Sequence, residues 1–159
     1  MIKINIIAVG KLKEKYLADA CSEYLKRLRA YAKVEIIEIN EYRAKDNPSA
    51  SEIEIIKDKE GEMILSKVSS SAFVIPMCIE GTQLSSEELS KRIENIMLTS
   101  GEIDFIIGGS FGLSDKVKQR GNFRLSFGKI TLPHQLMRVI LLEQTYRAFS
   151  IINNSKYHK

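Results

Sequence analysis

Cysteine and histidine are scarce in this 159-residue chain, which contains two of each. Cys21 and Cys78 both lie in apolar runs, so no disulfide framework is indicated and both thiols are expected in the core. His134 and His158 are far apart, and no CxxC or HExxH pattern occurs. The sequence therefore offers no ligand set for zinc, and we expect no metal site.

Targeting and membrane segments are also missing. Residues 1–10 are apolar but lack the charged flank and small-residue cleavage site of a signal peptide. No apolar stretch reaches the roughly 18 uninterrupted residues of a membrane span. We expect a cytoplasmic protein without a membrane partner, and the length predicts a single domain over residues 1–159.

Phosphate-binding loops are absent too, because neither GxGxxG nor GxxxxGK[ST] occurs. A nucleotide-dependent oxidoreductase or phosphotransferase therefore has little support.

The charge of the chain is distributed unevenly along the sequence. Residues 35–62 carry nine acids and four bases, whereas residues 116–159 carry nine bases and one acid. The basic end fits either a surface for phosphate backbones or a merely solvated face.

Short apolar strands alternate with helical patterns along most of the chain. The expected strands are residues 2–9, 34–39, 72–79 and 103–107, with a short apolar run at Phe123 and Leu125. Ser51 with Glu54 and Ser85 with Glu88 are candidate capping boxes for two of the helices between them. This alternation predicts the α/β class, with a mostly parallel sheet and helices on both faces.

The last expected helix, from Pro133 to about Ile152, is apolar in nearly every direction. Such a helix must be buried on all sides. A second copy of the chain could cover it, which predicts a homodimer. The alternative is that neighbouring helices of the same chain cover it.

Two turns follow strands in the second half and are candidates for a ligand pocket. They are residues 108–112 and residues 126–133. Ligands of parallel sheets bind beyond the carboxyl ends of the strands, and glycine permits close approach of the backbone. A tight turn without any ligand explains the glycines equally well.

The joint pattern of motifs is distinctive. It comprises Ala8-Val9-Gly10-Lys11-Leu12-Lys13, Gly108-Gly109-Ser110-x-Gly112, Leu125-Ser126-Phe127, Ile130-Thr131-Leu132-Pro133-His134-Gln135, Arg138, Glu143-Gln144-x-Tyr146-Arg147-Ala148 and Tyr157-His158-Lys159. Over essentially its whole length, the chain resembles the ribosomal RNA large subunit methyltransferase H family of the SPOUT methyltransferases. The resemblance implies a trefoil knot in the C-terminal half, a homodimer and S-adenosylmethionine as cofactor. It also implies methylation of N3 of pseudouridine 1915 in helix 69 of 23S rRNA, on the assembled 70S ribosome.

Matching the family position by position implies a set of cofactor contacts: Met77, Gly108, Gly109, Phe127, Gly128, Lys129, Ile130, Thr131 and Leu132. Backbone groups and apolar walls suit a ligand that is neutral at its adenine and cationic at its sulfur. Met77 stands where relatives often have leucine, and Phe111 where a polar residue is common. Pro76 lacks an N–H, which indicates a strand end or an irregular approach to the site.

The same resemblance points to Arg147, His158 and Tyr157 as catalytic residues. Nearby positive charge or a base would help an imide nitrogen to lose its proton. Alternatives remain, because Arg147 could simply pair with Glu143, and C-terminal tails such as that bearing His158 are usually inert. His134 could cap or pack the last helix, or contact the substrate.

Basic residues near the second turn are the candidates for RNA binding: Lys116, Lys118, Arg120, Arg124 and, from the tail, Lys159. Lys11, Lys13 and Lys15 could extend this surface or simply start a solvated helix. Basic charge alone would also suffice for a ribosome-binding protein without catalysis, which is the main rival function.

Overall fold

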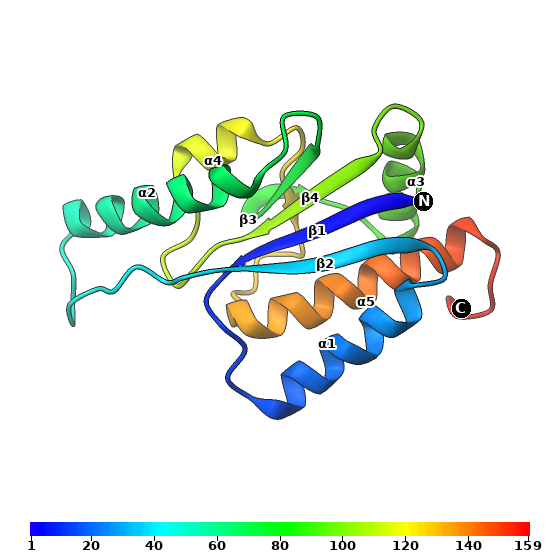
Figure 1. Cartoon of the computed structure of the whole chain (residues 1–159), viewed down its shortest axis with the longest axis horizontal. Coiled ribbons are helices and arrows are strands. Elements are labelled where there is room, and N and C mark those ends of the chain that lie inside the picture. The colour runs from blue at the N-terminus through cyan, green and yellow to red at the C-terminus, as the bar shows by residue number, and fades with distance from the viewer.

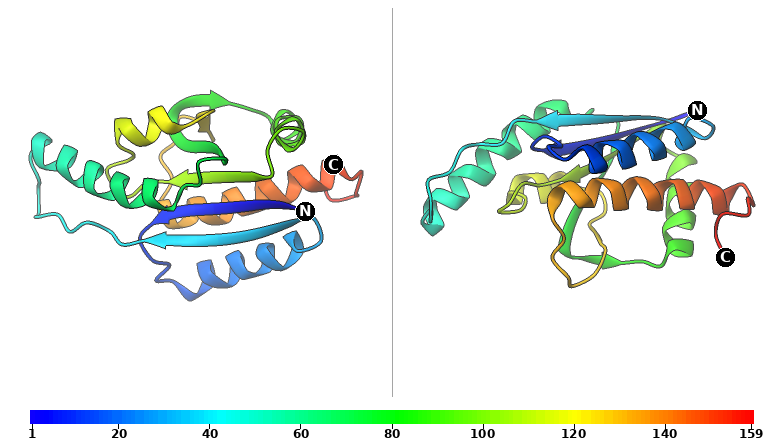
Figure 2. Two further views of the ribbon diagram at one scale, coloured as in Figure 1. Left: turned by 45° about the horizontal axis from the view of Figure 1, so that its top comes forward. Right: turned by 90° about the horizontal axis from the view of Figure 1, so that it is seen from below.

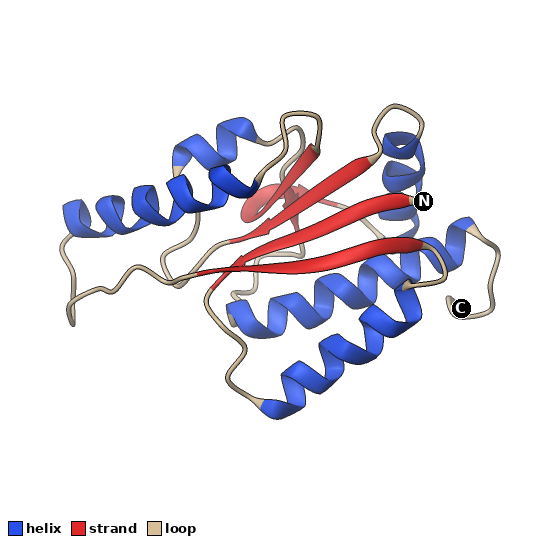
Figure 3. Cartoon of the chain, viewed as in Figure 1, coloured by secondary structure: helices blue, strands red, loops and turns tan.

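The computed structural model describes residues 1–159 and contains one five-stranded sheet. All strand pairs are parallel, and the order across the sheet is β2-β1-β4-β3-β5 (Figures 1 and 3). The strands are β1 (Ile2–Val9), β2 (Ala32–Ile39), β3 (Phe73–Gln83), β4 (Glu102–Ile107) and β5 (Leu125–Ser126). The predicted α/β class and parallel sheet are confirmed.

Helices cover both faces of this sheet (Figure 2). One face carries α1 (Lys15–Leu28), α3 (Ser86–Met97) and α5 (His134–Ile152), and the other carries α2 (Ala50–Lys67) and α4 (Asp115–Arg120). A parallel sheet needs this arrangement because its strands are joined by crossover helices and its apolar side chains point both ways.

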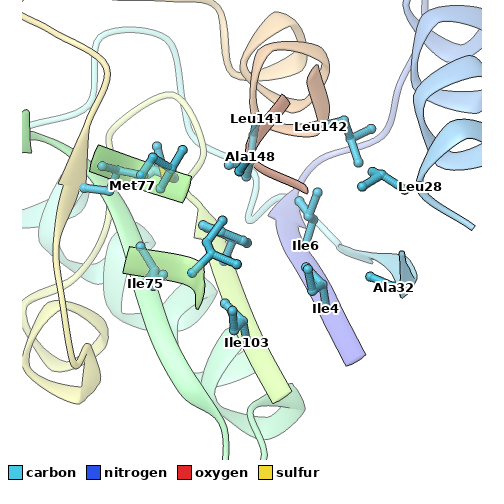
Figure 4. Close-up of a cluster of buried hydrophobic side chains, with 14 of the residues drawn as sticks. Ile4, Ile6, Leu28, Ala32, Ile75, Met77, Ile103, Leu141, Leu142 and Ala148 are labelled. Atoms are coloured by element: carbon cyan, nitrogen blue, oxygen red, sulfur yellow. The ribbon is translucent and has the colours of Figure 1, made fainter. Parts of the chain in front are cut away.

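The strands place alternate residues into two separate cores. Ile4 and Ile6 of β1 face α1, α3 and α5, where they belong to the same buried cluster as Leu142 (Figure 4). Ile7 and Val9 point to the opposite face, toward α2 and α4. This two-residue period follows from the pleat of a strand, and it fixes the register of the central strands.

Helix starts confirm one predicted cap and correct the other. Ser85 and Glu88 form the expected capping box of α3, with bonds of 3.0 Å and 2.7 Å to each other's backbone N–H. The box predicted at Ser51 was wrong. Helix α2 begins two residues earlier, because Ser49 accepts a 3.2 Å bond from the Glu52 N–H.

Strand β3 runs further than the sequence indicated. It continues to Gln83 rather than ending near Ile79, but its pairing with β5 shifts register between Met77 and Thr82. The shift follows Pro76, which has no N–H for a regular ladder. The irregular approach that this proline indicated is therefore observed, and it lies beside the carboxyl end of β4.

Helix α5 is covered partly by its own chain. It packs against both α1 and α3, and its own residues Leu141, Leu142 and Phe149 are fully buried. Leu136, Val139 and Ile140 remain partly exposed. Neighbouring helices thus account for much of the apolar surface, and the homodimer stays a prediction that concerns the remaining face.

Two further observations bear on the surface. No helix combines the length and the apolar character needed to cross a membrane. Strand β2 forms one edge of the sheet and exposes Lys33 and Glu35 along it.

Candidate active site

A cavity of about 700 Å³ opens beyond the carboxyl ends of β4 and β5 and beside the middle of β3. Met77 of β3, Ile107 at the end of β4 and Leu125 of β5 line it. Its walls are residues 108–113 on one side and residues 126–134 on the other, apart from Lys129. The two turns that the sequence singled out therefore come together as one pocket, at the position where parallel sheets bind ligands.

The first wall is a tight turn that only glycine fits. A Cβ on Gly108 would stand 2.9 Å from the backbone carbon of Gly112, closer than packed atoms approach. A Cβ on Gly109 would meet the side chain of Glu60 at 3.1 Å. The glycines bring backbone amides and carbonyls to the cavity surface without intervening side chains.

The second wall is a loop held by one buried serine. The Ser126 hydroxyl accepts from the Gly128 N–H and donates to the Gly128 carbonyl, both at 3.1 Å. Gly128 has φ +122°, a conformation that side-chain-bearing residues rarely adopt. Ile130, which is 79% exposed, projects from the same loop at the cavity mouth.

Eight of the nine residues expected to contact a cofactor line this cavity: Met77, Gly108, Gly109, Phe127, Gly128, Ile130, Thr131 and Leu132. Lys129 does not, because its side chain is exposed and lies outside the lining. The loop as a whole lines the cavity, and its contacts with a cofactor stay a prediction.

The cavity also includes residues outside the expected set of cofactor contacts. Cys78 is half-buried and lines the cavity, so its placement in the core was wrong. Burial raises the pKa of its thiol. His134 lines the cavity at the start of α5, and Phe111 lies at the tip of the glycine turn. The Cys78 thiol donates a long bond of 3.7 Å to the Pro76 carbonyl.

Arg147, Tyr157 and His158 form a second cluster, organised by Glu143. The Arg147 guanidinium donates to Glu143 Oε1 from Nε at 3.0 Å and from Nη2 at 2.5 Å. The Tyr157 hydroxyl donates to the same oxygen at 3.1 Å, and His158 Nδ1 lies 3.1 Å from Arg147 Nη1. The tail is therefore docked on α5, and the expected Glu143–Arg147 pair is present.

Contacts within this cluster shift the pKa values of Arg147, Tyr157 and the neighbouring Glu87. The hydrogen bond to Glu143 raises the pKa of Arg147 further, so the guanidinium stays charged. Burial, then hydrogen bonding to Tyr24 and Glu143, raises the pKa of the Tyr157 phenol. His158 Nε2 lies 2.6 Å from Glu87 Oε1, and this contact lowers the pKa of Glu87. The cluster presents a permanent cation, a neutral phenol and an imidazole.

Within one chain, this cluster and the cavity are well separated. His134 starts α5 at the cavity, and Arg147 follows thirteen residues later. At 1.5 Å per residue that is about 20 Å along the helix axis. Met137, about one turn after His134, also lines the cavity. About 15 Å of helix therefore separates the lining from Arg147.

Comparison with known proteins assigns the family. Residues 2–158 match the model of the predicted SPOUT methyltransferases. The chain belongs to the SPOUT methyltransferase family. The resemblance seen in the motifs is thereby confirmed, and it covers nearly the whole length.

Relatives of this SPOUT protein are similar from end to end. Proteins named ribosomal RNA large subunit methyltransferase H from Bacillus pumilus, Clostridioides difficile and Enterococcus faecalis are 52%, 51% and 50% identical. Each match covers 99% of this chain and 100% of the relative. A solved probable methylase family protein from Haemophilus influenzae shares the fold, with TM-score 0.52, 13% identity, and coverage of 99% of this chain and 70% of that one.

The residues expected to bind RNA divide into two groups in this SPOUT chain. Lys116, Arg124 and Lys159 are exposed. Lys118 pairs with Glu80 at 2.5 Å beside the cavity. Arg120 donates to the carbonyls of residues 69 and 72 at 3.1 Å and 3.3 Å, which ties the end of α4 to the start of β3. Its Nη2 is used in the fold, and its role in RNA binding stays a prediction.

Proposed function

We propose that the protein transfers a methyl group from S-adenosylmethionine to N3 of pseudouridine 1915 in helix 69 of 23S rRNA. It acts in the cytoplasm, as a homodimer, on the assembled 70S ribosome. The single observation that carries this proposal is the junction of the two glycine-bearing segments into one cavity at the carboxyl edge of the sheet. Family membership and the names of the relatives support the same activity.

The cavity suits this cofactor in size and chemistry. Ligand pockets commonly span about 300–1,000 Å³ with mostly apolar walls. Met77, Phe127, Leu132 and Met137 supply apolar surface here, while the turn at 108–112 supplies backbone amides and carbonyls. When bound, S-adenosylmethionine supplies an electrophilic methyl group on a sulfonium centre.

The chain's own residues then have to prepare the nucleophile. N3 of the base is an imide nitrogen that must lose its proton before it can attack. Arg147 is a permanent cation that would favour the deprotonated base. The His158 imidazole is the candidate base. Arg147 donates to its Nδ1, so this contact has to open before Nδ1 can accept the proton. Oε1 of Glu143 accepts hydrogen bonds from both Arg147 and the Tyr157 hydroxyl, and these bonds orient the two side chains.

These side chains reach a cavity only across a dimer. Arg147 lies ten residues beyond Met137, the last residue of α5 in the cavity lining, which is about 15 Å along the helix axis. We propose that the cluster completes the cavity of the partner subunit. The partly exposed face of α5 is the surface through which the two copies would meet. This arrangement also explains why a C-terminal tail is docked in place rather than loose.

Mass spectrometry of 23S rRNA tests the assignment directly. Cells lacking this protein should lose one methyl group on one pseudouridine, and the gene supplied in trans should restore it. Titration of the purified protein with S-adenosylmethionine separates the enzyme from a non-catalytic ribosome-binding protein, which would show no saturable binding. Unchanged rRNA in the deficient cells would refute the proposed substrate.

A further inference from the structure

A second hollow adjoins the cavity on the α2 side of the molecule. It encloses about 580 Å³ between the connection at residues 41–48 and the glycine turn. Ser110 and Phe111 line both spaces, so the two cavities share one wall. A ligand in the hollow would lie next to whatever occupies the larger cavity.

The lining combines three kinds of group that suit a nucleotide. Tyr42 and Phe111 are 42% and 37% exposed, which leaves aromatic surface available for a base. Arg43 and Lys45 are exposed cations on the same connection and can meet phosphate, although Glu41 and Asp46 of this connection also line the hollow. Glu60, only 3% exposed, supplies a carboxyl group at the inner end.

Glu60 lacks the partners that a buried carboxylate needs. Its Oε2 accepts one bond from the Tyr42 N–H at 3.1 Å, and no lysine or arginine pairs with it. Burial raises its pKa, and the nearby Glu41 adds to this. Isolated buried carboxylates are costly unless hydrogen-bond donors reach them. An N–H group from a ligand in the hollow would supply the missing donor.

We propose that this hollow binds the target nucleotide and that Glu60 accepts a hydrogen bond from a ring N–H of its base. Arg43 and Lys45 hold the flanking phosphates. This inference rests on the proposed function and adds a determinant of specificity to it. In pseudouridine the sugar is attached through carbon, so ring N1 carries a hydrogen, whereas N1 of uridine carries the sugar. An acceptor placed at N1 therefore distinguishes the two bases.

Two substitutions of Glu60 test the inference through substrate preference. Glu60→Gln keeps a weaker acceptor and Glu60→Leu removes it, while both relieve the buried charge and should fold. Methylation is measured on ribosomes that carry either pseudouridine or unmodified uridine at the target. The ratio of the two kcat/KM values should fall about tenfold in Glu60→Leu, with Glu60→Gln intermediate, as loss of a good hydrogen bond to a base implies. Affinity for S-adenosylmethionine should not change.

The control is Glu62→Gln, an exposed glutamate two residues along α2. It should keep the wild-type ratio. A purely structural role for Glu60 would lower activity on both ribosomes equally, and that result would overturn the inference while leaving the proposed function intact. Wild-type protein inactive on both ribosomes would instead refute the proposed function and this inference with it.

The KM for ribosomes tests the proposed phosphate contacts separately. Arg43→Ala combined with Lys45→Ala should raise the KM for ribosomes about tenfold, since two cation–phosphate contacts are lost. The preference for pseudouridine should persist, because Glu60 is untouched. A KM equal to that of wild type would exclude the 41–48 connection from the RNA-binding surface.

Discussion

Two buried polar residues in the sheet, Asn5 and Asp104, lower the stability of this fold because their hydrogen bonding is incomplete. Asn5 of β1 and Asp104 of β4 are neighbours in the sheet and almost fully buried. The Asn5 amide donates to Asp104 Oδ1 at 2.8 Å, but Asp104 Oδ2 and Asn5 Oδ1 have no hydrogen-bond partner. Burial raises the pKa of Asp104. This carboxyl is a cost to the folded state whenever it is ionised.

Asp104→Asn should therefore stabilise the protein. The pKa of Asp104 is higher in the folded than in the unfolded protein, where it is about 3.9. Protonated Asp104 therefore contributes its full stability to the fold below the unfolded pKa. This contribution is lost as the pH rises through the folded pKa. We expect the variant to gain about 1–2 kcal/mol in free energy of unfolding at pH 8. The gain should shrink toward pH 4 in urea titrations.

The exposed Asp58→Asn is the matched control for this pH series, and it should show no such trend. A loss of stability in Asp104→Asn at pH 8 would mean that the ionised carboxylate is favoured in the sheet. In that case the bond from Asn5 outweighs the burial.

At the scale of elements, α2 contains a glycine for a packing reason. Helical propensity predicts that Gly61 weakens the helix. The structure shows that a Cβ there would stand 2.4 Å from the Ser114 hydroxyl oxygen, which caps α4. The absence of a side chain lets the start of α4 approach α2. Through this contact, α2 supports the segment that follows the glycine turn.

Gly61→Ala should destabilise the protein although alanine is the better helix former. Overpacking a tight contact costs about 1–3 kcal/mol, more than the propensity gain of about 1 kcal/mol. Thermal unfolding measures the difference. Glu62→Ala, on the exposed side of the same helix, is the comparison and should change the midpoint little. A stabilised Gly61→Ala variant would show that α4 can shift at no cost.

Sequence patterns identified the longer elements and missed those set by tertiary contacts. Central strands such as β1 and β4 are apolar runs whose period and length are visible directly. Helix α4 has only six residues and was not predicted, because its cap at Ser114 depends on packing against α2. The two pocket turns were found from glycine and family motifs. Glu60 was not, since its burial depends on how residues 41–48 cross α2.

For the whole molecule, the separation of cavity and cluster is the central fact. The catalytic candidates lie at one end of α5 and the cavity at the other. The helix expected from Pro133 to about Ile152 already contains both His134 and Arg147, so their separation follows from spacing once the structure places the cavity at the start of that helix. The trefoil knot implied by the family likewise stays a prediction. What the fold does establish is that a single copy does not hold all the proposed groups in one place.

Mixing two inactive variants tests whether two copies share a site. One variant ends after Ser155 and so lacks the tail residues, and the other carries Gly109→Arg, which should fill the cavity. Each alone should bind ribosomes but not methylate them. After exchange of subunits at equal concentrations, one site in each mixed dimer is intact, so about a quarter of wild-type activity should return.

The truncated variant should bind S-adenosylmethionine normally, because its own cavity is complete. That measurement is the control for the mixing experiment. Activity that stays at background in the mixture, with subunit exchange confirmed, would mean that each tail serves its own chain.

The edge of the sheet decides how copies of this chain can associate. An unpaired strand is a template onto which another strand can add, and long flat edges lead to open-ended aggregates. The charged residues Lys33 and Glu35 along β2 oppose such growth, and β5 at the other edge is only two residues long. Pairing with strands of other copies is therefore disfavoured at both edges of the sheet. Copies of the chain are expected to associate through their helices, which permits a closed oligomer of fixed size.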